Sequence, residues 1–323
     1  MSGNIIGEAM KNPFKAIKSL PKAVYKDLIL AASSHSLIGT NVFERDWDLL
    51  IILDTCRVDA LQVVADEYKF LSNNTIYSTT SVGGSTLEWT ANTFTDPFKR
   101  EISNTGLISA NGWPKKILHD GYRPDDRLPF SLIPKQWNTI HESDLGKHIP
   151  AWKRGPGRGG ESDQPQAGAN TVIDLAIRLG RKEKFDRIIA HLIEPHYPYI
   201  GAIEQDDNTE ISKFGAYPWQ YINSDGDLER LWDLYLDELR LGLDAVELLL
   251  NNFSADRVLI TSDHGEAFGE FRTFGHGSGS LHPKVRWVPV LWTSATDDGS
   301  YEPQEFDRND VNVGENLKAL GYR

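Results

Sequence analysis

From residue 46 onward, short apolar runs alternate with stretches of helical periodicity. The apolar runs predict strands at 47–53, 75–80, 106–110, 187–193, 257–261 and 288–292. Apolar residues spaced by three or four positions predict helices between them, at 58–68, 169–181 and 228–253. Strands that are apolar throughout are covered on both faces. The pattern therefore predicts an α/β fold with a mostly parallel central sheet sandwiched between helices.

The N-terminal segment has a different pattern. Over residues 5–32, apolar side chains recur every three or four positions, which predicts helix, and Pro13 and Pro21 are expected to divide it. The lysines follow a similar period, so the segment is amphipathic and basic. It either lies on an anionic membrane surface through residues 1–32 or packs against the body with its lysines in solvent. The second interpretation is favoured, because most amphipathic helices face a core.

Charge separates this segment from the rest of the chain. Residues 1–28 carry five lysines against two acidic residues, a balance of +3, whereas the whole chain carries −12 and the remainder therefore −15. An acidic body excludes a broad nucleic-acid-binding face, so no nucleic-acid partner is expected.

Hydropathy and cysteine use bear on location. No apolar run is long enough to span a bilayer, and there is no apolar leader. The sequence therefore predicts a cytoplasmic protein, with attachment to the inner face of the membrane as the alternative if the N-terminal segment binds lipid. Cys56 is the single cysteine, which excludes an internal disulfide and a multi-cysteine zinc site.

Candidate chemistry gathers at the predicted strand ends. Asp54 follows the first predicted strand, and the adjacent Asp263 and His264 follow the fifth. Because parallel strands present their carboxyl ends at one edge of a sheet, these side chains are expected to meet there. Carboxylate oxygens and imidazole nitrogens bind Zn²⁺, Mn²⁺ or a similar divalent ion. Each aspartate alone is better explained as a cap of the following helix or turn. Together, with His276 close behind, they favour a metal site.

Several segments carry a resemblance to a known family. They are ILDTCRVDAL, SVGGSTLEWT, HLIEPHYPYIG and ITSDHGEAFGE, with FGHG and HPKVRWVPVLW following the last. On these segments the chain resembles the sulfatase-like branch of the alkaline phosphatase superfamily, over residues 46–293. The resemblance implies a sulfatase-like or alkaline-phosphatase-like catalytic domain over 46–323, preceded by a helical arm over 1–45.

The resemblance also implies roles for individual residues. Asp54, Asp263 and His264 match the family's metal ligands, so a divalent cation is implied (Zn²⁺, Mn²⁺ or Ca²⁺), with a second cation as a further alternative. His196 and His276 match histidines that hold the substrate's oxyanion, protonate the leaving group or bind a second metal.

Thr86 stands where the family keeps a nucleophile that also contacts the metal. Ser85 is adjacent, and the sequence leaves open which hydroxyl reacts. Thr86 is preferred because the family's nucleophile begins a short turn into a helix, as residues 87–89 do here. A turn built on the preceding glycine pair, without chemistry, is the competing explanation. A threonine hydroxyl needs activation near neutral pH, which a bound divalent cation supplies.

Two basic residues, Arg57 and Lys284, are candidates to bind an anionic ester substrate, since their side chains can clamp a phosphate or sulfate group. Lys284 is equally well explained as a solvated loop charge. Two features depart from the family. The chain lacks the Cys/Ser-x-Pro-x-Arg signature whose first residue becomes formylglycine in true sulfatases. The Asp-x-x-x-His pair of two-metal members is not evident around residues 191–196, so one metal is the expected count.

Together these observations predict a metal-dependent hydrolase or transferase that acts on phosphate esters or diesters through a threonine nucleophile. His196 or His276 is expected to assist the leaving group. Two alternatives stay open at this point: a sulfatase-like sulfuric ester hydrolase without formylglycine, and a non-catalytic binding member of the fold.

Overall fold

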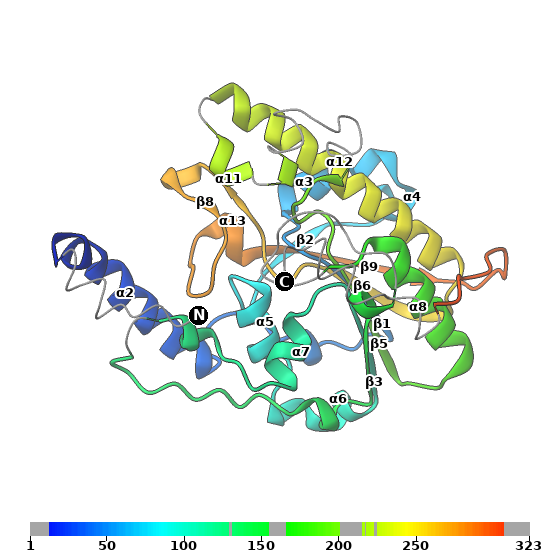
Figure 1. Cartoon of the computed structure of the whole chain (residues 1–323). Coiled ribbons are helices and arrows are strands. Elements are labelled where there is room, and N and C mark those ends of the chain that lie inside the picture. The colour runs from blue at the N-terminus through cyan, green and yellow to red at the C-terminus, as the bar shows by residue number, and fades with distance from the viewer. Residues whose placement is uncertain are drawn as a thin grey trace.

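A seven-stranded sheet forms the centre of the computed structural model (Figure 1), which describes residues 13–128, 131–154, 166–200, 215–216, 218–222 and 225–306. The strand order is β2-β9-β6-β1-β5-β3-β4. These strands are β1 (Leu49–Leu53), β2 (Tyr77–Thr80), β3 (Thr105–Ser109), β4 (Lys147–Pro150), β5 (Arg187–Leu192), β6 (Ala255–Thr261) and β9 (Trp287–Ala295). Strand β9 is antiparallel to both of its neighbours, and the other pairings in this sheet are parallel. The predicted mostly parallel sheet is therefore confirmed.

Helices cover both faces of the sheet (Figure 1). Because successive side chains of a strand point to opposite faces, alternate residues of β1 enter two separate cores. Leu49, Ile51 and Leu53 pack with α3 (Val58–Val63), α8 (Ala169–Lys182) and α12 (Asp225–Asn251). Leu50 and Ile52 pack with α5 (Thr86–Thr93), α6 (Lys99–Ser103) and α7 (Trp113–Leu118). The predicted helices at 169–181 and 228–253 correspond to α8 and α12.

Some elements differ from the predicted ones. The helix expected at 58–68 ends at Val63, and a 3₁₀ turn (Ala65–Glu67) and α4 (Lys69–Ser72) follow it. Strand β4 was not predicted, because its sequence KHIP is short, half polar and ends in proline. A small hairpin of β7 (Ala267–Phe268) and β8 (Phe274–Gly275) lies outside the main sheet. Single helical turns form α11 (Pro218–Tyr221) and α13 (Pro283–Arg286).

Helix α2 (Pro13–Ser34) projects from the body at the left of Figure 1. The predicted helix at 5–32 is confirmed from Pro13 on, and its first residues lie outside the described part. The expected division at Pro21 is wrong, since the helix continues through that residue with the loss of one backbone hydrogen bond. The division of the chain into an arm over 1–45 and a catalytic domain stays a prediction. In the described segments, no helix is both long enough and apolar enough to cross a membrane.

Candidate metal centre

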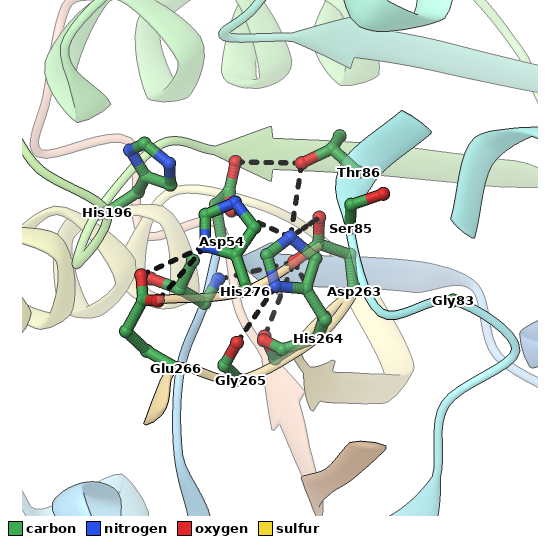
Figure 2. Close-up of polar contacts among 12 residues, drawn as sticks. Asp54, Gly83, Ser85, Thr86, His196, Asp263, His264, Gly265, Glu266 and His276 are labelled. Atoms are coloured by element: carbon green, nitrogen blue, oxygen red, sulfur yellow. Dashed lines mark hydrogen bonds and ion pairs between the residues drawn. The ribbon is translucent and has the colours of Figure 1, made fainter. Parts of the chain in front are cut away.

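Three neighbouring strands, β5, β1 and β6, bring the candidate metal ligands to one edge of the sheet. Asp54 follows β1 directly, and Asp263 lies two residues beyond the end of β6. The chain turns sharply after Asp54, because Thr55 has left-handed backbone with φ 65°, which is rare for a β-branched residue. Both carboxylates are buried, and each offers an oxygen within 4.8 Å of the other (Figure 2). The expectation that these side chains meet is therefore confirmed.

Each carboxylate is held through one of its two oxygens. Asp54 Oδ2 accepts hydrogen bonds from Thr86 Oγ1 and Asn111 Nδ2, both at 3.3 Å. Asp263 Oδ1 accepts from the backbone N–H of Thr55 at 3.3 Å. The other oxygens, Asp54 Oδ1 and Asp263 Oδ2, are buried without a hydrogen-bond partner in the described part of the chain. Because an unpaired buried carboxylate oxygen is costly, the two mark a place for a cation.

His264 brings a ring nitrogen to the same point. Its Nδ1 donates to the carbonyl of Gly265 at 3.0 Å, which fixes the tautomer and leaves the lone pair on Nε2. Nε2 lies 3.4 Å from Asp263 Oδ2 and 3.6 Å from Asp54 Oδ1. Burial, with the neighbouring His276 adding to it, lowers the pKa of His264 well below its usual value. A neutral imidazole of this kind is a metal ligand.

His191, in β5, is a further candidate ligand that sequence reasoning missed. Neither of its ring nitrogens has a hydrogen-bond partner among the described residues, and Nε2 lies 3.8 Å from Asp263 Oδ2. Asp54, His191 and Asp263 each offer a ligand atom, and these atoms all lie within 4.8 Å of one another. Burial lowers the pKa of His191. The signal available in the sequence was a single histidine among the apolar residues of the segment IIAHL. The structure shows that this strand pairs with β1, the strand that precedes Asp54.

The electrostatics of the two buried carboxylates, Asp54 and Asp263, also favour a bound cation. Burial is the main cause that raises the pKa of Asp54, and the Asp263 carboxylate raises it further. Burial likewise raises the pKa of Asp263, against the attraction of His191. Two carboxylates and imidazole nitrogens around one point are the donor set of Zn²⁺ or Mn²⁺ sites. The buried Asp-His-Asp group can therefore bind a divalent metal.

Of the two adjacent hydroxyls, Thr86 faces this point (Figure 2). Thr86 begins α5, and its Oγ1 lies 3.3 Å from Asp54 Oδ2 and 3.4 Å from His264 Nε2. Ser85 is the N-cap of α5: its Oγ accepts the N–H of Glu88 at 3.2 Å and lies 2.6 Å from the hydroxyl of Ser278. The sequence could not distinguish the two hydroxyls, whereas in the structure only the Thr86 hydroxyl lies beside the candidate metal ligands and the Ser85 hydroxyl caps α5.

The two predicted leaving-group histidines lie together beside the buried ligands. The Nδ1 of His276 is 3.0 and 3.1 Å from the two carboxylate oxygens of Glu266. Burial alone would lower the pKa of His276, but the Glu266 carboxylate raises it above its usual value. The His276 ring centroid is 4.4 Å from that of His264 and 5.2 Å from that of His196. Both His196 and His276 are partly exposed, where a substrate can reach them.

Glu88, on α5, connects four separate segments around the site. Its Oε2 accepts the backbone N–H groups of Gly84 at 2.9 Å and Gly279 at 2.8 Å. Its Oε1 accepts from the Arg286 guanidinium at 2.7 Å and from the hydroxyl of Ser33, on α2, at 2.6 Å. One buried carboxylate thus joins the turn before α5, the loop after β8, α13 and α2. Sequence reasoning gave Glu88 no role.

The two basic residues predicted to bind substrate are both paired with acidic side chains. Arg57 donates to the Asp59 carboxylate at 2.6 and 2.9 Å and lies 2.8 Å from Glu270. Lys284 Nζ also lies 2.6 Å from Asp59. Arg57, and not Asp54, is the N-cap residue of α3, which removes the capping explanation of Asp54. A role of Arg57 and Lys284 in substrate binding stays a prediction.

No family model and no curated protein matches the chain. Among solved structures, the soluble domain of lipooligosaccharide phosphoethanolamine transferase A from Neisseria meningitidis is similar, with 16% identity over 76% of this chain and 75% of that chain and a TM-score of 0.47. The C-terminal periplasmic domain of EptC from Escherichia coli, in complex with Zn, has 13% identity over 84% and 79% of the two chains and a TM-score of 0.43. The 2-O GAG sulfatase BT1596 has 13% identity over 85% and 70% of the chains and a TM-score of 0.41. These neighbours belong to the sulfatase-like branch of the alkaline phosphatase superfamily, the group that the sequence motifs resemble.

The predicted cytoplasmic location is contradicted by these comparisons. The EptC domain from Escherichia coli is periplasmic by name, as is the C-terminal domain of EptC from Campylobacter jejuni. The prediction depended on the lack of an apolar leader in this sequence, and that lack does not identify a compartment. The expectation of attachment to the inner face of the membrane is withdrawn with it.

Proposed function

We propose that this chain is a metal-dependent hydrolase or transferase that acts on phosphate esters or diesters, with Thr86 as its nucleophile. One observation carries the proposal. Asp54 Oδ1, Asp263 Oδ2 and both ring nitrogens of His191 are buried without hydrogen-bond partners in the described segments, and the Thr86 hydroxyl lies beside them. A structural cluster of polar groups would satisfy these atoms, whereas a metal site needs them.

Asp54, Asp263, His264 and His191 are the residues that would hold the metal. A bound divalent cation supplies positive charge that favours the ionised form of a neighbouring hydroxyl and offsets the charge of a phosphoryl group. His264 is oriented for this by its Nδ1 bond to the backbone, and each aspartate by the bonds to its second oxygen.

The first chemical step is attack of Thr86 Oγ1 on phosphorus. The Oγ1–P bond forms as the bond between phosphorus and the leaving oxygen breaks, giving a phospho-threonine intermediate. Asp54 Oδ2, at 3.3 Å, is the acceptor within reach of the hydroxyl proton. The leaving oxygen takes a proton from an imidazole. His276 suits this role, because Glu266 holds its Nδ1 and Nε2 is the nitrogen left to exchange a proton.

The second step releases the phosphoryl group from Thr86. A water molecule or an acceptor alcohol attacks phosphorus and gives its proton to the imidazole that acted before. The Oγ1–P bond breaks, and Thr86 Oγ1 takes back the proton that Asp54 Oδ2 accepted in the first step. Water gives hydrolysis, and an alcohol gives transfer. The ring centroid of His196 lies 5.2 Å from that of His276. His196 could therefore take part in the same proton transfers, or it could bind the phosphoryl oxygens.

Turnover and metal content of matched variants test the proposal. Protein loaded with Zn²⁺ or Mn²⁺ is assayed on an aryl phosphate monoester, an aryl phosphate diester and an aryl sulfate. Thr86→Ala should lose roughly a thousandfold or more in kcat while it keeps its metal. Ser85→Ala is the control, because it removes the adjacent hydroxyl and the cap of α5 but leaves Thr86 in place.

Each of the other possible outcomes would point to a different function for this chain. Full activity of Thr86→Ala would reject the nucleophile. Faster turnover of the sulfate than of either phosphate would favour a sulfatase without formylglycine. A protein with neither stoichiometric metal nor turnover would be a binding member of the fold.

A further inference from the structure

Helix α2 contacts the body through Leu30 and through small and polar side chains. The buried residues of its C-terminal half include Asp27, Leu30, Ala31, Ser33 and Ser34. Asp27 pairs with Lys135, an ion pair whose side chains are both almost fully buried. The Ser34 hydroxyl accepts a backbone hydrogen bond from the loop that carries Lys135. Helix α2 is therefore held to the body by buried polar groups together with the apolar side chain of Leu30.

Large apolar side chains lie on the other side of α2. Leu28 is 49% exposed and Tyr25 is 47% exposed. Pro21, Tyr25, Leu28 and Ala32 follow one another at spacings of four, three and four residues, so they form a single stripe along the helix. In the sequence the same spacing continues back to Ile17. An amphipathic helix that served only the core would point this stripe inward.

The charge of α2 matches the surface of an anionic bilayer. Lys22 is exposed and follows Pro21 directly, so it lies about 100° around the helix from that member of the stripe. In the sequence, residues 1–28 carry +3, while the rest of the chain carries −15. An acidic body alone would be repelled by anionic lipid, whereas each lysine close to the surface attracts it.

We propose that α2 docks this protein on the surface of an anionic lipid bilayer. Tyr25 and Leu28 enter the interfacial region, and the exposed Lys22 contacts the headgroups. The helix lies in the plane of the surface and does not span it. This proposal is independent of the proposed activity, because binding is measured without substrate.

The docking helix adjoins the candidate active site. A side chain at Gly279 would place its Cβ 3.0 Å from Lys26 Cγ and 3.5 Å from Leu30 Cγ, so the loop after His276 runs directly against α2. The segment leading into and through this loop also exposes large apolar side chains, Phe271, Phe274 and Leu281. Because Leu30 is a buried residue of α2, this loop contacts the side of the helix that faces the body.

Vesicle co-sedimentation of the full chain tests the proposal. The probes are vesicles of phosphatidylcholine mixed with phosphatidylglycerol, and vesicles of phosphatidylcholine alone. We expect the wild type to bind the mixed vesicles, and binding to fall as salt is raised. Leu28→Gln should weaken binding about tenfold. Its control is Leu241→Gln, which changes a leucine of similar exposure, 47%, on α12.

The lysine contribution is tested in the same way. Lys22→Gln should weaken binding about fivefold. Lys184→Gln, at an exposed lysine beyond the end of α8, is its control and should bind as the wild type does. All four substitutions are at exposed positions, so the unfolding temperature should stay that of the wild type.

Three results would overturn the proposal. One is a wild type that binds neither kind of vesicle. Another is equal loss of binding in Leu28→Gln and Leu241→Gln. The third is a wild type that self-associates without lipid and becomes monomeric on Leu28→Gln, which would make the stripe a contact between copies of the chain.

Discussion

The Glu88 carboxylate and the Arg286 guanidinium form an ion pair at 2.7 Å whose side chains are 0% and 3% exposed. It lies beneath the turn that leads to Thr86. The same carboxylate accepts the N–H groups of Gly84 and Gly279, so the position of Thr86 and that of the loop after β8 depend on one charged group.

Glu88→Gln should be strongly destabilising. The amide keeps the size of the side chain but leaves the buried Arg286 charge without its partner, at a cost of about 3–5 kcal/mol. Denaturant unfolding measures this loss. The control is Glu67→Gln, which breaks the exposed pair with Arg240 and should cost less than about 1 kcal/mol. Similar losses in the two variants would show that the Glu88 network does not hold the site together.

His191→Gln should weaken metal binding more than about tenfold, because it removes a ligand nitrogen from the centre. Metal titration followed by calorimetry measures the change. His148→Gln is the matched control. His148 lies on β4 of the same sheet, and its two ring nitrogens are hydrogen-bonded to Ser109 and Glu142. If His191→Gln lowers stability but leaves metal affinity intact, His191 is a packing residue of the core.

Removal of metal should destabilise the protein, and Asp54→Asn should abolish that effect. Without a cation, Asp54 and Asp263 are two neighbouring buried carboxylates. Burial, and then the charge of Asp263, raise the pKa of Asp54, so the ionised form of Asp54 is disfavoured. Asp54→Asn should therefore stabilise the metal-free protein by about 1 kcal/mol or more, yet gain nothing when metal is added. Thermal unfolding with metal and with a chelator measures both effects.

Asp59→Asn gives the contrasting control for this prediction. Asp59 pairs with Arg57 and Lys284, which lower its pKa to about 2 against the opposing effect of burial. Its neutralisation should destabilise the protein with and without metal and leave the metal-induced shift unchanged. An Asp54→Asn variant that behaves like Asp59→Asn would argue against a metal at Asp54.

Glu142 should contribute to stability in a pH-dependent way. The hydrogen bond from His148 is the main cause that lowers the pKa of Glu142 to about 2, with His119 adding to it and burial opposing it. A carboxylate whose folded pKa is depressed stabilises the fold above its unfolded pKa, about 4.3 for glutamate, and loses this contribution as the pH falls towards its folded value. The difference in unfolding free energy between the wild type and Glu142→Gln should therefore shrink as the pH falls from about 5 to about 2. A difference that stays constant over this range would contradict the assignment.

The strand ends that carry Asp54 and Asp263 could be predicted from the apolar residues that precede them. Asp54 directly follows LLIIL, and Asp263 lies two residues beyond the strand that ends in VLIT. Runs such as LLIIL are typical of central parallel strands, and parallel strands bring their carboxyl ends together. His191 escaped the prediction for the opposite reason: it lies within its strand, where a single histidine among apolar residues is typical of the core. Only the register of β5 against β1 shows that this core position adjoins the carboxylates.

Other features depend on contacts that no local pattern encodes. Glu88 receives hydrogen bonds from residues between 4 and 198 positions away in the sequence, so nothing around it distinguishes it from an ordinary helical glutamate. Ser85 and Thr86 are adjacent, and their roles separate only when α5 is built, because the helix cap turns one hydroxyl away from the carboxylates. The apolar periodicity of α2 could be seen in the sequence. Which side of the helix contacts the body could be seen only in the structure.

The bond from Ser33 to Glu88 bears on how the protein can be shortened. A chain cut at residue 35 would lose α2 and with it the Ser33 hydroxyl, which lies 2.6 Å from the Glu88 carboxylate. That carboxylate also holds the turn before Thr86 through the N–H of Gly84. Such a truncation would also uncover Lys135 by removing Asp27, its buried counterion. If the chain has the proposed activity, the shortened protein should lose it in part even on water-soluble substrates. Loss of activity on deletion of the arm would then be no proof that lipid attachment is needed for turnover.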